Sequence, residues 1–262
     1  MSYAATMVAT FDWLSLLAVI ATLVPLVLLE RWIHQHLHGI GLLLTGSQDA
    51  AVLLYALPLL PGVVLHELSH WLVAKLLGVK TTKVSLLPRR QRGGRVQLGA
   101  VIVQQTDVVR ASLIGVAPLV SGSLVVLVIG ERALDVGLLG EALRTGDIGA
   151  IFAAWLAALR APDMWLWLYL LFAVANAMLP SPSDRETWPP VILFLVGIVV
   201  VAYVLGFSNF LLELAPLAVS ALRWLAAAFA VTLVADAPFV ILIICAEWLL
   251  GTLRGQRVFY KK

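Results

Sequence analysis

Long apolar windows separated by short polar stretches dominate the chain. Each window approaches the roughly 20 apolar residues that a helix needs to cross the hydrocarbon core of a bilayer. The seven windows are Phe11–Ile33, Ala51–Leu77, Val108–Ile129, Met164–Leu179, Pro189–Leu205, Leu211–Val234 and Pro238–Leu253. The last two nearly touch and are compatible with one long bent helix. The pattern therefore predicts an all-α polytopic membrane protein with six to seven transmembrane helices.

The fourth window is short and has an apolar neighbour. Ile151–Leu159 precedes it, and residues 160–163 separate the two. Two interpretations remain open for the earlier piece. It either lies along the membrane interface or extends the span around a kink at Pro162.

The polar segment between the second and third windows has a different pattern. Residues 79–88 and 94–104 are rich in β-branched side chains that partly alternate with polar ones, and Pro88, Gly93 and Gly94 interrupt them. Such runs, bounded by turn residues, are typical of strands. We expect a small β-hairpin or sheet at the cytoplasmic face after the second helix.

The composition agrees with a membrane protein. Hydrophobic residues make up 61% of the 262 residues and charged residues only 13%, whereas soluble domains are about half apolar and a quarter charged. The lipid bilayer is therefore an expected partner. The single cysteine, Cys245, excludes an intramolecular disulfide and a zinc site built from cysteines.

The charge pattern indicates an orientation. Residues 75–95 contain seven basic side chains and no acidic one, which is typical of a cytoplasmic loop beside a span. The run directly follows a span, so we interpret it as a topology signal and expect no nucleic-acid partner. The basic C-terminal tail also favours the cytoplasm. An even number of crossings would satisfy both segments if the N-terminus is inside, and the parity stays open.

The second window contains chemistry that a lipid-facing helix does not need. His66, Glu67 and His70 form the pattern H-E-x-x-H, which puts two imidazoles one turn apart on one helical face. They can hold one Zn²⁺ while Glu67 acts on water. Each ionisable group near the centre of a bilayer costs a few kcal/mol. The alternative is a hydrogen-bonded polar cluster that holds helices together.

A catalytic zinc ion usually takes a third protein ligand. The stretch from Asn176 to Glu186 is the strongest candidate source, because Pro180 and Pro182 end the apolar helix there and Asp184 follows. Unwound backbone at membrane depth is tolerated where it lines a cavity or packs on protein. We therefore expect the interrupted helix end to direct Asp184 back toward the histidine pair.

These two motifs together resemble the site-2 protease family of intramembrane zinc metalloproteases. Asn176 and Asp184 keep the family's spacing, Pro182 matches, and the small-residue helix around Arg110–Gly122 is similar to the family's third helix. The resemblance covers about Ala51 to Asp184. It implies a metalloprotease core over residues 51–188, preceded by a first helix and connecting segment (1–50) and followed by C-terminal helices (189–262).

The resemblance also implies roles for individual residues. Zinc would be held by His66, His70 and Asp184, Glu67 would be the catalytic base, and Asn176 would contact the scissile segment. The implied substrate is a transmembrane segment of another membrane protein. Independently of the resemblance, the lack of targeting features suits a prokaryotic plasma membrane, and the basic segment 75–95 puts the expected active site toward the cytoplasmic side.

The chain also departs from the family. The first proline is one position late, at Pro180, and Arg185 replaces the glycine that normally follows the aspartate. These departures leave open a non-proteolytic scaffold or complex subunit, and a broken helix with midplane histidines also leaves a transporter open. The sequence does not decide between a homo-oligomer and a complex with other proteins.

Several other polar residues have ordinary explanations. His34, His36 and His38 suit an interfacial polar belt, with a second metal site as the alternative. Asp107 precedes the third window and suits a helix cap. The charged residues of the later spans suit pairing within a bundle or contact with an interface, and they are Glu213, Arg223, Asp236 and Glu247.

Overall fold

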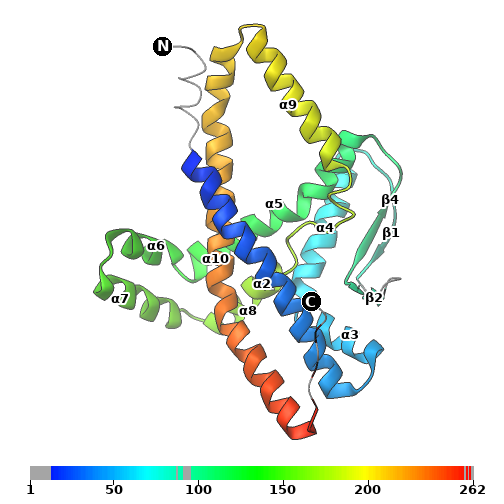
Figure 1. The fold of residues 1–262 in the computed structure, drawn as a ribbon, viewed down its shortest axis with the longest axis vertical. Coiled ribbons are helices and arrows are strands. Elements are labelled where there is room, and N and C mark those ends of the chain that lie inside the picture. Colours follow the sequence, from blue (N-terminus) through cyan, green and yellow to red (C-terminus); the bar gives the residue numbers. More distant parts are fainter. Residues whose placement is uncertain (1–12, 87, 91–95, 257, 259, 261–262) are drawn as a thin grey trace.

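The computed structural model describes residues 13–262, except 87, 91–95, 257, 259, 261 and 262. Most of the described chain is helical (Figure 1). The helices are α2 (Trp13–Thr45), α3 (Gln48–Ala56), α4 (Leu60–Leu76), α5 (Val108–Ala133), α6 (Val136–Thr145), α7 (Ile148–Leu159), α8 (Met164–Ala175), α9 (Trp188–Val204) and α10 (Ser208–Arg254). The strands are β1 (Thr81–Ser85), β2 (Arg89–Arg90), β3 (Val96–Gln97) and β4 (Ala100–Val103).

Within the described residues, three helices are long and apolar enough to cross a membrane, namely α2, α5 and α10. The pair α3 and α4 is bent by 76°, and the pair α7 and α8 by 96°. Counting each bent pair as one span raises the number to five. The helical class is thus confirmed, and the six to seven spans expected from the sequence are not.

The end of the chain accounts for part of this difference. Windows Leu211–Val234 and Pro238–Leu253 lie in one helix, the 47-residue α10, which has Pro216 and Pro238 inside it. Proline removes one backbone hydrogen bond, which neighbouring helices can compensate within a bundle. At about 1.5 Å per residue, α10 is about 70 Å long, and it runs the height of the molecule in Figure 1.

The polar segment after α4 forms small antiparallel sheets, as the sequence predicts. Strand β1 pairs with β4, with Val84 opposite Val101, and β2 pairs with β3. A bulge interrupts the first pair between Thr81 and Lys83. Gly93 and Gly94, to which the sequence assigns the turn, lie outside the described residues.

Two clusters of buried side chains hold the helices together. One cluster joins α2, α5, α8 and α10 and includes Leu26, Val126, Leu171 and Phe229. The other joins α2, α4, α8 and α10 around Ile33, Leu59, Phe172 and Ile243. Helix α9 contributes no buried residue and lies apart from these clusters in Figure 1. Helices α2, α8 and α10 therefore take part in both clusters, and α4 and α5 each contribute buried residues to one of them.

Candidate metal centre

Helix α4 carries the two histidines and the glutamate on adjacent positions of one surface. The helix starts after Leu59, with Pro61 in its first turn, where a missing N–H costs nothing. His66 is partly buried, whereas Glu67 and His70 are 5% and 7% exposed. All three side chains therefore lie against protein rather than on the outer surface of the helix.

Asp184 reaches the histidines from the segment between α8 and α9. Its carboxylate accepts a hydrogen bond from the Ser181 backbone N–H at 2.7 Å, and its own N–H donates to the Ser181 carbonyl at 3.1 Å. This local turn folds the chain back after Pro180, which cannot continue a helix. Asp184 Oδ1 lies 3.3 Å from His70 Nε2, and Oδ2 lies 3.6 Å from His66 Nε2. The structure thus brings the three residues together.

The spacing of these atoms fits a tetrahedral metal ion. The two Nε2 atoms are 3.1 Å apart, and potential ligand atoms of His66, His70 and Asp184 all lie within 4.8 Å of one another. With metal–ligand distances of about 2.0–2.1 Å, adjacent ligands of a tetrahedral zinc site are about 3.3 Å apart. The Nε2–Nε2 separation of 3.1 Å and the two Nε2–Oδ separations of 3.3 and 3.6 Å bracket that value. The residues present therefore fit the metal that the sequence implies.

Hydrogen bonding also prepares the histidines to bind a cation. His66 Nδ1 lies 2.6 Å from the Ala177 carbonyl, and His70 Nδ1 lies 2.8 Å from the Ile114 carbonyl. A carbonyl only accepts hydrogen bonds, so both Nδ1 atoms must donate. In neutral imidazoles this leaves two Nε2 lone pairs only 3.1 Å apart, which is unfavourable unless a proton or a metal ion lies between them. Backbone carbonyls commonly orient metal-binding histidines in this way.

Small residues permit the close approach of the segment that carries Asp184. A Cβ atom at Gly115 on α5 would overlap with the Asp184 carbonyl oxygen. Likewise, a Cβ atom at Gly122 would overlap with Met178, and one at Gly62 with the Ala173 carbonyl. Close helix packing through glycine is common in membranes. These three glycines therefore let α8 and the following turn reach the histidines on α4.

Glu67 lies between the histidines and strand β4. The Val101 backbone N–H interacts with its carboxylate, and a Cβ atom at Gly99 would be only 2.5 Å from Glu67 Oε1. The chain at the start of β4 therefore covers the glutamate. Glu67 and the three candidate ligands all line one cavity of about 780 Å³, together with Asn176.

The side chain of Asn176 is directed toward α10. Its Nδ2 donates to the Phe172 carbonyl and to Asp236 Oδ1, at 2.9 Å each. Asn176 is 1% exposed and Asp236 is completely buried. From the sequence alone, Asp236 is interpreted as pairing within a bundle or contacting an interface. The only signal for this contact was an acidic residue in an apolar span, which does not identify its partner.

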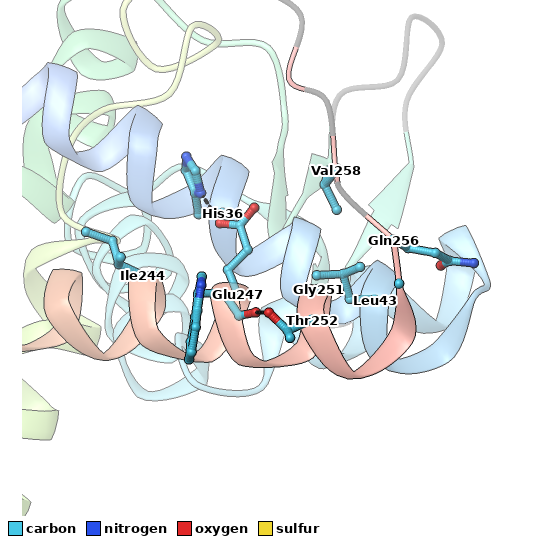
Figure 2. Close-up of a pocket in the computed structure, with 10 residues that line it drawn as sticks. His36, Leu43, Ile244, Glu247, Gly251, Thr252, Gln256 and Val258 are labelled. Atoms are coloured by element: carbon cyan, nitrogen blue, oxygen red, sulfur yellow. Dashed lines mark hydrogen bonds and ion pairs between the residues drawn. The ribbon is translucent and has the colours of Figure 1, made fainter.

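The three histidines at the end of α2 do not assemble into a second metal site. Among the described residues, the one cluster of three or more potential ligands is His66, His70 and Asp184. His34 Nε2 contacts the Asn176 carbonyl at 3.0 Å, whereas His36 pairs with Glu247 on α10. Figure 2 shows this pair at the wall of a cavity of about 620 Å³, where the end of α10 packs beside α2.

Glu247 also holds the C-terminal segment, because the Tyr260 hydroxyl donates to Glu247 Oε1 at 2.7 Å. Burial and this hydrogen bond raise the pKa of Tyr260 above its ordinary value. Tyr260 packs so closely against Gly39 that a Cβ atom there would overlap with its hydroxyl. The polar residues at this end of α10 thus pair with one another, as the sequence suggests for Glu247.

No family model matches this chain, and no curated protein or solved structure is matched by it. A function for the protein therefore has to be argued from its own residues.

Proposed function

We propose that the protein is a zinc-dependent intramembrane endopeptidase, which hydrolyses a peptide bond within or near a transmembrane segment of another membrane protein. The observation that carries this proposal is the convergence of Asp184 on His66 and His70, whose potential ligand atoms all lie within 4.8 Å of one another. The two motifs and their spacing also resemble the site-2 protease family. The resemblance assigns Asn176 to the scissile segment, but its buried side chain bonds to the Phe172 carbonyl and to Asp236, so contact with a substrate would require these bonds to open.

The chemistry follows from the positions of the side chains. Zinc bound by the three ligands would supply Lewis acidity, which activates water near neutral pH and polarises a carbonyl. Glu67 follows His66 on the same helix and lines the same cavity, so it can take a proton from the attacking water and deliver it to the leaving amine. The Ala177 and Ile114 carbonyls keep the two imidazoles oriented throughout.

The β1–β4 pair borders the candidate site. A helical substrate has its peptide bonds hydrogen-bonded internally, so it must unwind before attack. We infer that the unwound segment is held by β-addition to the sheet after α4, because β4 contacts Glu67 through the Val101 N–H.

The membrane topology that fits best has six crossings. Five come from α2, α5, α10 and the two bent pairs, and the sixth requires the 17-residue α9 to cross as well. Seven would require α10 to cross twice. Six crossings put the basic segment 75–95 and the basic tail on one side, which we take as the cytoplasm of a prokaryotic cell. A reporter of cytoplasmic location, fused in the basic segment 75–95 or to the basic tail, tests whether both lie on the same side of the membrane.

The direct test of the proposed activity is a Glu67→Gln variant, assayed for zinc content and for cleavage of a panel of transmembrane substrates in detergent or vesicles. We expect it to keep its zinc and to lose cleavage by at least about 100-fold, the usual contribution of a general base. The matched control is Glu213→Gln, which alters an exposed glutamate on α10. Cleavage by Glu67→Gln at the rate of the parent would rule out the proposed role of Glu67.

One observation favours a second function, a non-proteolytic membrane scaffold that keeps the metal site. Glu67 is covered by the chain at the start of β4, and Arg185 adds a charge beside Asp184. A scaffold would bind zinc, co-purify with a larger complex and cleave none of the substrates in the panel. Turnover that depends on Glu67 would exclude it.

A further inference from the structure

Asn176 and Asp236 form a buried pair whose hydrogen bonds are incomplete. Both hydrogens of Asn176 Nδ2 have partners, the Phe172 carbonyl and Asp236 Oδ1. This pattern fixes the amide orientation, because an amide oxygen in that position would face two acceptors. The two remaining oxygens, Asn176 Oδ1 and Asp236 Oδ2, are buried and have no hydrogen-bond partner.

An ionised Asp236 would be costly in this environment. The residue is completely buried within an apolar helix bundle, and leaving a carboxylate there without a cation costs several kcal/mol. Asn176, which follows α8, bonds to Asp236, and Glu30 on α2 opposes a negative charge there. The cations Arg31 and Arg185 act on Glu30 and are not among the groups that act on Asp236.

We propose that Asp236 is the neutral carboxylic acid and that its Oδ2–H donates to Asn176 Oδ1, closing a cyclic acid–amide pair. One proton then satisfies both unpartnered oxygens and removes the buried charge. Buried polar groups are nearly always hydrogen-bonded, so two unsatisfied acceptors on side chains that already share one hydrogen bond call for a donor. The pair then connects α10 to Asn176, the residue that follows α8, through two hydrogen bonds.

This pair makes Asp236 a positioning residue for the metal site, an inference that rests on the proposed zinc function. The carbonyls of Asn176 and Ala177 contact His34 and His66 respectively. Helix α8 packs against both α4 and α10, so anchoring Asn176 to α10 fixes the turn that orients His66. Outer groups that orient a metal ligand typically contribute 10- to 100-fold to metal affinity.

Two substitutions of Asp236 test whether the metal site depends on the two hydrogen bonds of the neutral pair. Asp236→Asn keeps both hydrogen bonds as an amide–amide pair without charge, so its zinc affinity should stay within about threefold of the parent. Asp236→Leu removes both bonds, and its zinc affinity should fall about 10- to 100-fold. The matched control is Thr232→Val, one turn earlier on α10, whose hydroxyl is buried but bonds only to the Ala228 carbonyl of its own helix.

Infrared spectroscopy provides a readout that does not depend on zinc. The metal-free parent should show the carbonyl band of a buried carboxylic acid, shifted by deuterium exchange and absent from Asp236→Asn. If that band is missing, or if Asp236→Asn loses as much zinc affinity as Asp236→Leu, the neutral pair is wrong. Unchanged affinity in Asp236→Leu would overturn the positioning role. A parent without zinc would instead overturn the proposed function, and the infrared result would still decide the protonation of Asp236.

Discussion

The replacement Gly115→Ala should disable the metal site without altering any candidate ligand. Its Cβ atom would overlap with the Asp184 carbonyl oxygen and would lie 3.2 Å from the carbonyl carbon. Ordinary contact between such atoms needs about 3.5 Å, so the turn must retreat by about 1 Å. A metal site tolerates displacements of only about 0.2 Å. The Asp184 carboxylate moves with its own backbone and should leave the coordination sphere.

The expected result is a 10- to 100-fold loss of zinc affinity, or more, measured by competition with a chromophoric chelator in detergent. The overpacking itself should cost about 1–3 kcal/mol, which leaves a folded protein. Gly197→Ala on α9 is the matched control, because a Cβ atom there meets nothing within 4 Å. Equal zinc affinity in the two variants would refute the argument that close packing on α5 holds Asp184 in place.

Three further outcomes follow from single contacts. The first-turn N–H of α5 holds the pKa of Asp107 below its usual value. Stability from this cap is therefore present above about pH 4 and lost as the pH falls through the lower folded pKa. Asp107→Ala should lower the melting temperature at neutral pH and not near pH 2. Tyr260→Phe removes the hydrogen bond to Glu247 and should lower the free energy of unfolding by about 1 kcal/mol. It should also speed trimming of the C-terminus by carboxypeptidase, and unchanged trimming would contradict the role of this bond in anchoring the C-terminal segment. Val101→Pro removes the N–H that contacts Glu67 within the strand proposed to hold the unwound substrate, so it should reduce cleavage while zinc is retained. Full activity in this variant would rule out substrate binding by β-addition.

The sequence predicted the clustering of His66, His70 and Asp184 better than it predicted the spans. His66 and His70 share a face on any helix, and Pro180 and Pro182 mark where the backbone must turn, so the approach of Asp184 follows from local rules. The number of spans does not follow from local rules. Pro238 looks like a break, yet packing along α2 keeps α10 continuous.

The contacts around the ligands could not be predicted from the sequence. Asp236 lies 60 residues from Asn176, and no periodicity relates the two positions. The same holds for Gly115, whose role is visible only when the Asp184 carbonyl lies against it. Sequence patterns identify the residues that bear chemistry, whereas tertiary packing decides which neighbours orient them.

The most direct test of the metal centre is the zinc content of the purified protein, measured by elemental mass spectrometry beside an Asp184→Ala variant, with Glu67→Gln as a folded reference. The parent and Glu67→Gln should each hold roughly one zinc ion per chain, and Asp184→Ala should hold far less after dialysis, because two imidazoles alone make an incomplete site. A parent that retains no zinc, or an Asp184→Ala variant that retains as much as the parent, would contradict the assignment of His66, His70 and Asp184 as its ligands.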